Sequence, residues 1–400
     1  MKKRILSLLL LLALLLSFTS CIGVRADELS AGYEKRDSGV KAAHNEGFYA
    51  DFSVKLLNGA AKKGKNALVS PLSATVALAL LANGLGGESL SQTERATGLT
   101  LDGLNAEALY LSQSLKTGDK CKIRLANSLW FEDMFKTSVK SAYLQKNADL
   151  FGAQIYAAPF DSSTVSDINK WCGKNTDGMI NKIIDGFTEN TVLMGINALV
   201  FDAEWRAKYE KNDIKKLIFH NYDGTEKKTD FLCSDEQLLY GDGYAGFYKM
   251  YEGDNYCFTA ILPDKDVYEF ASELTGEKLN KMWSEHNHGS VSVKLPEFAF
   301  DGEADLKEIF GNMGMTDVFD REKADMSNLS DTDCYISAFE QKTRIELDRN
   351  GTKAAAISFF PGAGMAAPPP EEIIFDRPFL FTITDVSNGI PLFIGIAANL

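Results

Sequence analysis

Proline is scarce in this chain, and its distribution is uneven. The sequence has 400 residues and ten prolines, yet Pro361, Pro368, Pro369 and Pro370 lie within ten residues of one another near the C-terminus. A fold of long strands and helices tolerates few prolines, because each one fixes φ and removes a backbone donor. The cluster therefore needs a local reason, and a stiff segment held outside the fold would supply one.

Histidine and cysteine are also few, and neither has the spacing of a metal site or a disulfide framework. The histidines are His44, His220, His286 and His288, and no third ligand is near the last two. The six cysteines form no CxxC pair, so we expect mostly buried free thiols. HExxH, GxSxG, P-loop and EF-hand patterns are absent. The sequence therefore predicts no enzyme, no catalytic residue, no metal and no cofactor.

Positive charge is in deficit, with 42 Lys and Arg against 55 Asp and Glu and a formal net charge of −13. A polyanionic surface repels phosphate backbones, which argues against nucleic acid as a partner. Hydrophobic residues (45%) and charged residues (24%) are near the averages for folded proteins, which excludes disorder and coiled coil. No linker or repeat divides the chain after about Lys41, so we expect a single domain over residues 42–400.

The N-terminus has the layout of an export signal. Basic residues at positions 2–4 precede an apolar run of about twelve residues, too short for a bilayer core that needs about twenty. Cleavage before Cys21 would leave a lipid-bearing cysteine, and cleavage after Ala26 would release a soluble protein. We expect a signal peptide over residues 1–20 and a polar tether over residues 21–41. The product is then exported, extracellular or a cell-surface lipoprotein, and reaches a membrane only through lipid at Cys21.

Periodicity predicts helices and strands in separate runs, which indicates an α+β fold. Ser70 as N-cap and Pro71 at the first helical position predict a helix to about Leu81. Apolar residues four apart predict another helix from about Phe48. A further helix is expected at 166–172, and strands at 68–69, 123–125, 191–201, 256–262, 291–300, 343–347 and 379–384.

A series of short segments occurs in the order typical of one family. They are 66–73 (NALVSPLS), 127–130 (NSLW), 197–205 (NALVFDAEW), 262–263 (LP), 295–298 (LPEF), 306–315, 351–356 (GTKAAA), 375–379 (FDRPF) and 392–395 (LFIG). Each is weak alone, but together they resemble the serpin family, and the chain is similar to a bacterial exported member. The resemblance implies a serpin fold with three β-sheets, eight or nine helices and an exposed C-terminal reactive loop.

The resemblance also implies a function. A serpin offers its reactive loop as a substrate, is cut with formation of an acyl-enzyme, and inserts the cut loop into its main sheet before the ester is hydrolysed. We place the loop at about residues 349–374. Fifteen residues from Gly351, the usual distance in the family, predict Met365-Ala366 as the reactive bond. An apolar residue there suits an elastase-, chymotrypsin- or subtilisin-like serine protease.

Insertion places a demand on the loop hinge, because alternate side chains must enter a packed core. The hinge residues implied by the family are Gly351, Thr352, Lys353, Ala354, Ala355 and Ala356. With Thr352 facing in, the inward set stays small until Phe360, which favours an inhibitory member. Pro361 departs from the pattern, since it removes one donor from a strand that must enter the sheet.

The family also implies a loop-entry gate and a sheet-centre cluster. Serpins usually pair a Lys with a Glu at the gate, whereas this chain has Glu297 and Arg349, the same pair with its signs exchanged, beside Trp205. The cluster residues are Ser70, Ser73, Asn197 and, where the family often has His, Gln341.

We therefore expect a monomeric suicide-substrate inhibitor whose partner is a serine protease held as a covalent acyl complex. A papain-like cysteine protease is the lesser alternative target. The rival hypothesis is a non-inhibitory serpin that serves as a surface binding or structural protein.

Overall fold

The computed structural model of the protein describes residues 24–188, 191–284, 289–351 and 372–400. One sheet consists of β1 (Asp27–Glu28), β3 (Cys121–Glu132), β4 (Gln154–Ala158), β5 (Leu193–Ala203), β11 (Phe298–Asp305) and β12 (Ala338–Leu347). Their spatial order is β1-β4-β3-β5-β12-β11. Strand β5 is antiparallel to β3 but parallel to β12.

The other strands form a nine-stranded sheet that is continuous through one long strand, β7. Its members are β2 (Ala67–Val69), β6 (Ile214–His220), β7 (Glu226–Gly241), β8 (Tyr244–Met250), β9 (Tyr256–Pro263), β10 (Ser290–Pro296), β13 (Glu372–Ile374), β14 (Phe379–Asp385) and β15 (Pro391–Ala397). The first part of β7 pairs with β6 and β10, and its last residues pair with β8. The three expected sheets thus correspond to the six-stranded sheet and to two parts of the nine-stranded sheet, which β7 joins.

The described residues contain nine α-helices, in agreement with the expected fold. They are α2 (Glu46–Ala60), α3 (Pro71–Ala82), α4 (Gly87–Thr97), α5 (Leu101–Ser114), α6 (Ser141–Phe151), α7 (Ser162–Asn175), α8 (Val267–Ser272), α9 (Gly276–Ser284) and α10 (Leu306–Asn312). The start of α3 is as predicted: the Ser70 side chain accepts a bond from the Ser73 amide, and Pro71 is the first helical residue. Every residue of α3 is buried, so this helix is a core element.

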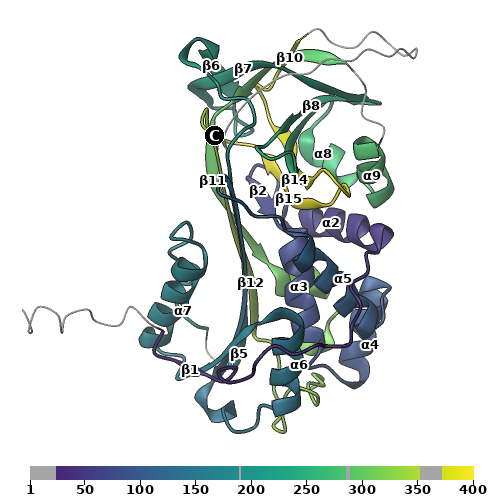
Figure 1. Cartoon of the computed structure of the whole chain (residues 1–400), viewed down its shortest axis with the longest axis vertical. Coiled ribbons are helices and arrows are strands. Elements are labelled where there is room, and N and C mark those ends of the chain that lie inside the picture. The colour runs from purple at the N-terminus through teal and green to yellow at the C-terminus, as the bar shows by residue number, and fades with distance from the viewer. Residues whose placement is uncertain (1–23, 189–190, 285–288, 352–371) are drawn as a thin grey trace, which may run out of the picture.

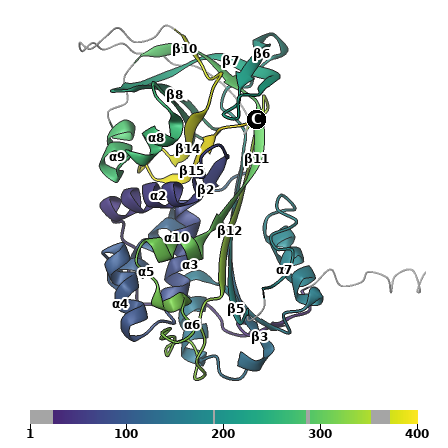
Figure 2. The same cartoon turned by 180° about the vertical axis from the view of Figure 1, so that it is seen from behind.

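The layers follow from which faces are apolar. Figure 1 shows the six-stranded sheet along the long axis, with α2 to α6 on one side, α7 on the other, and the nine-stranded sheet with α8 and α9 at one end. Viewed from behind in Figure 2, α10 lies near α2 and α3, and it contacts α2 and β12. The main core lies between α3 and the six-stranded sheet, and a smaller apolar cluster under α7 covers the opposite face.

The single strand expected over residues 291–300 is two strands in different sheets. β10 ends at Pro296, which has no N–H to continue a ladder, and β11 begins at Phe298 in the six-stranded sheet. Glu297 lies at the crossing, where its amide donates to the carbonyl of Asp230 (2.9 Å). The prediction of continuity was wrong, and the break places Glu297 between the two sheets.

The described part of the expected tether is bound to the domain. β1 pairs with β4 and so forms the edge of the six-stranded sheet, and the amides of Arg25 and Ala26 donate to the carboxylate of Asp167 (2.9 and 3.1 Å). Further along, the Arg36 amide donates to Asp149 (2.9 Å). The polar composition did not reveal this, because a sheet edge binds an extended segment through backbone groups whatever its side chains are.

Across the described ranges, no helix is long and apolar enough to cross a membrane. The same ranges hold no group of three or more His, Cys, Asp or Glu side chains that could hold a metal. The five cysteines within these ranges are free thiols, four of them buried, and burial raises the pKa of Cys121, Cys172, Cys257 and Cys334 to about 12. His286 and His288 lie outside the described residues.

Candidate functional site

The six-stranded sheet is closed at one end and parted at the other. Strands β5 and β12 pair from Met194 with Ala338 to Leu199 with Thr343. Their ladder stops there, although β5 continues to Ala203 and β12 to Leu347. The remaining residues of each strand pair with the outer neighbours, β3 and β11. The chain leaves β12 at this parted end, where the reactive loop was expected to begin.

A tight turn follows β12 and reverses the chain. The amide of Asp348 donates to the carbonyl of Gly351 (2.7 Å), and the Gly351 amide donates back to Asp348 (3.3 Å). The Asp348 carboxylate accepts from the amides of Asn350 (2.7 Å) and Gly351 (3.0 Å). Gly351 also forms an antiparallel bridge with Glu204, which directly follows β5. Gly351 therefore lies between the ends of β5 and β12 and pairs with both.

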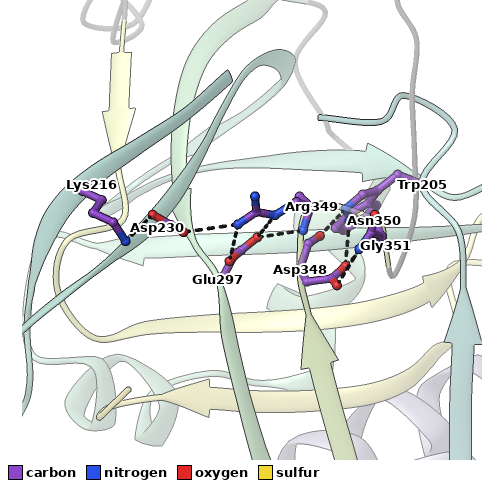
Figure 3. A network of polar contacts seen from close by, with 8 residues as sticks. All are labelled: Trp205, Lys216, Asp230, Glu297, Asp348, Arg349, Asn350 and Gly351. Carbon is purple, nitrogen blue, oxygen red and sulfur yellow. Dashed lines mark hydrogen bonds and ion pairs between the residues drawn. The ribbon is translucent and has the colours of Figure 1, made fainter. Parts of the chain in front are cut away.

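The expected partners Glu297 and Arg349 meet at the parted end of the sheet, on the β11 side of β12, as Figure 3 shows. Arg349 Nε donates to Glu297 Oε1 (3.0 Å), Nη2 donates to Oε2 (3.4 Å), and the Arg349 amide donates to Oε1 (3.0 Å). The bond to Glu297 raises the pKa of Arg349. The contact joins the residue before β11 to the residue after β12, two strands that are paired at this end (Phe298 with Leu347), so it holds the beginning of the turn against β11.

Two further charges extend this pair, and we call the set Lys216, Asp230, Glu297 and Arg349 the gate network. Arg349 Nη2 also donates to Asp230 Oδ2 (3.2 Å), and Lys216 lies 2.9 Å from Asp230 Oδ1. Lys216 first, and then Arg349, lower the pKa of Asp230. Sequence reasoning missed Lys216 and Asp230, because β6 and β7 come to the gate only through the pairing of the nine-stranded sheet.

Trp205 anchors the turn from the other side. Its indole Nε1 donates to the carbonyl of Asp348 (3.1 Å), and its ring is fully buried and stacked on Tyr251 (centroids 4.7 Å apart, planes 7° apart). Trp205 thus binds the residue next to Arg349 in the chain. The turn is therefore held by hydrogen bonds and ion pairs, which can break and form again and so are suited to holding and releasing a segment.

The sheet-centre residues form one buried hydrogen-bond chain under the closed part of the sheet. The Gln341 side chain accepts from the Ser70 amide (2.9 Å) and donates to the Ser70 carbonyl (3.0 Å) and to Asn197 Oδ1 (2.6 Å). Asn197 Nδ2 donates to the Ser73 carbonyl (2.9 Å) and to Asn127 Oδ1 (2.6 Å). The Ser73 hydroxyl is buried with no partner in the described structure.

Asn127 is the member that sequence reasoning left out. It lies opposite Asn197, which lies opposite Gln341, so three adjacent strands present an amide at the same level. The signal was available, since Asn127 opens the segment NSLW, but its neighbour across the sheet could not be known from one sequence.

Comparisons with known proteins identify the family to which this fold belongs. The family model "Serpin (serine protease inhibitor)" matches residues 48–400. The chain belongs to the serpin family. Serpins are inhibitors rather than enzymes, so serine protease inhibition is the activity of the family to which this chain belongs.

Individual serpins match over most of their length. Plasminogen activator inhibitor 1 of Neovison vison is 29% identical over 366 residues, with 86% of this chain and 90% of that protein covered. The native structure of a thermophilic serpin, tengpin, is 36% identical with a TM-score of 0.86, and covers 94% of this chain and 100% of its own. The latent structure of tengpin is 35% identical with a TM-score of 0.78, covering 90% and 99%. The described fold is therefore more similar to the native than to the latent form of that serpin.

Several expected site residues of this serpin lie outside the described residues. They are the lipid-attachment residue Cys21, the reactive bond Met365-Ala366, and the hinge residues Thr352, Lys353, Ala354, Ala355 and Ala356. The two flanks are described: Gly351 lies at the parted end of the six-stranded sheet, and β13 pairs in parallel with β10 of the nine-stranded sheet.

Proposed function

We propose that this serpin is a suicide-substrate inhibitor of a serine endopeptidase with apolar or small specificity, of the elastase, chymotrypsin or subtilisin type. The observation that carries the proposal is the position of Gly351. It already pairs with the residue after β12 and with the residue after β5. It thus occupies the first position of a strand that would run down between them.

The direction of the chain suits insertion. A strand that follows the turn after β12 must run antiparallel to β12, and therefore antiparallel to β5 as well, because β5 and β12 are parallel. Insertion would replace one parallel ladder by two antiparallel ladders, which are slightly more stable per residue. Insertion of about twelve residues adds about as many net hydrogen bonds, so roughly 10 kcal/mol drives the movement.

The proposed reaction begins as ordinary proteolysis. The nucleophilic serine of the protease attacks the carbonyl of Met365, the bond to Ala366 breaks, and the new amine of Ala366 leaves as the N-terminus of the C-terminal fragment. The protease then remains attached to Met365 as an ester. Insertion of the segment after Gly351 carries this ester away before water cleaves it. A cysteine protease would form the corresponding thioester.

The proposal is tested by incubating the protein with an elastase and a subtilisin. We expect an SDS-resistant complex, cleavage at or within two residues of Met365 by mass spectrometry, and a large rise in the unfolding temperature of the cut protein. Ala354→Glu is the matched control, because a charge at an inward hinge position should leave cleavage intact and prevent insertion. A loop that is cut without forming any complex would favour the rival function, a binding or structural surface protein.

Export belongs to the same proposal. Cleavage before Cys21 is favoured over cleavage after Ala26, since the second would remove Arg25, whose guanidinium lies 3.3 Å from Asp167. A lipid on Cys21 would then place the inhibitor at the cell surface as a monomer. The mass of the mature N-terminus distinguishes the two.

A further inference from the structure

A lysine occupies a core position directly behind the gate. Lys249 of β8 is 4% exposed and lies on the same face of the strand as Phe247 and Tyr251, both fully buried. A charged group in such a position is costly unless it is paired. The structure provides the pair: Lys249 Nζ contacts Glu236 Oε1, and the Glu236 side chain is itself 10% exposed.

Two aromatic rings also face the Lys249 ammonium. It lies 4.6 Å from the ring centroid of Tyr209 and 5.6 Å from that of Trp205. Tyr209 is held in turn by a hydrogen bond between its hydroxyl and Ser234 (3.1 Å). An ammonium over a ring face is attracted by the ring quadrupole, and the attraction grows when the site is desolvated.

Both rings belong to the segment that follows β5. The backbone of Trp205 forms an antiparallel β-bridge with Tyr251, the residue after β8. The indole N–H of Trp205 donates a hydrogen bond to the carbonyl of Asp348 in the turn. One face of the Trp205 ring is stacked on Tyr251. Lys249 thus connects Glu236 of β7 to the Trp205 ring, which binds Asp348 in the turn after β12. A Met or Leu could fill the same space but would bind neither the carboxylate nor the rings in a fixed position.

We propose that Lys249 is a positioning residue of the loop-entry gate: with Glu236 as counterion, its ammonium fixes the Trp205 ring and so sets the rate at which the loop enters the sheet. The inference rests on the proposed function, since it concerns the insertion step. It assigns a role in the gate to β8, a strand outside the gate network.

The test measures insertion rates in variants of the full-length protein. The variants are Lys249→Met, and Lys249→Met with Glu236→Gln, which removes both charges and leaves no unpaired carboxylate. Each is held about 10 °C below its own unfolding temperature, so that global stability is matched. Insertion is followed as the fraction of protein whose loop a trace of subtilisin no longer cuts. The control is Phe247→Leu, which weakens the core from the same face of β8 without touching a charge.

We expect both Lys249 variants to insert on the order of tenfold faster than the Phe247→Leu control, the effect of losing about 1.4 kcal/mol of cation–π attraction. Lys249→Arg should restore a rate near that of the wild type, because it keeps the cation. In a Trp205→Phe background the acceleration should disappear, because the residue through which Lys249 acts no longer donates to Asp348.

Two results would overturn the inference: Lys249 variants no faster than the control, or an equal acceleration with and without Trp205. Failure of the proposed function has a different signature. If the wild-type protein, once cut in its loop, gains no thermal stability, then insertion itself does not occur, whatever the Lys249 variants do.

Discussion

Arg349→Glu is the substitution that acts most directly on the gate. Arg349 is the centre of the gate network, with three side-chain hydrogen bonds to two carboxylates. The substitution removes all three and places a third carboxylate beside Glu297 and Asp230. The bond from the residue-349 amide to Glu297 does not depend on the side chain. The perturbation is therefore electrostatic and local.

Its magnitude follows from the exposure of the three side chains. Arg349, Asp230 and Glu297 are 39%, 25% and 21% exposed, so the lost contacts are worth about 1 kcal/mol together. Two like-charge contacts at the same places add about 1 kcal/mol more, since the new carboxylate can turn toward water. The total of about 2 kcal/mol is a factor of about 30 in the opening equilibrium of the gate.

The assay is incubation below the unfolding temperature, with native electrophoresis and size exclusion to follow conversion of monomer into latent or polymeric forms. Arg344→Glu is the matched control: Arg344 is on β12, 31% exposed, and bound to Asp301 (2.8 Å) away from the gate. We expect Arg349→Glu to convert about 30 times faster, and Glu297→Lys to recover part of the loss. Equal conversion of the two arginine variants, with no interaction between positions 297 and 349, would refute the gate.

Two further predictions concern the closed part of the six-stranded sheet. Burial, and then the charge of Asp305, raise the pKa of the Glu340 carboxyl to about 7. Between about pH 4.3 and pH 7 the native state therefore keeps a proton that the unfolded state loses. The free energy of unfolding falls as the pH rises through that window. Glu340→Gln should therefore stabilise by about 1–2 kcal/mol at pH 8 and change little at pH 4.5, which thermal unfolding at the two values checks; equal effects at both would contradict it. Gln341→Leu should lower the free energy of unfolding by about 3 kcal/mol, because the amide and carbonyl of Ser70 and the Asn197 side chain lose their buried partner. A denaturant titration measures this, and Lys342→Leu, whose neighbour Glu303 is exposed, is the control that should change it by less than about 1 kcal/mol.

Much of the fold could be predicted because it depends on local chemistry. The cap at Ser70 and Pro71 identified α3, and apolar residues four apart identified α2, since burial of one face sets the period. Short apolar or alternating segments identified β2, β3, β5, β9, β12 and β14. The break at Glu297 was not predicted. The residues before and after Pro296 both favour an extended backbone. Only the strands with which they pair show that β10 and β11 belong to different sheets.

In the candidate site too, the side-chain properties could be predicted from the sequence, whereas the contacts between distant strands could not. The sequence alone determined that Glu297 and Arg349 carry charges opposite to the usual gate pair and that the residues after Gly351 are small enough to enter a core. It also determined the proline cluster of the loop, since these are properties of side chains. Only the tertiary structure decided that the pair meets, that Asp230 and Lys216 extend it, and that Lys249 lies behind Trp205. The reason is physical: such contacts join strands far apart in the chain, and their geometry depends on sheet pairing, which no local pattern encodes.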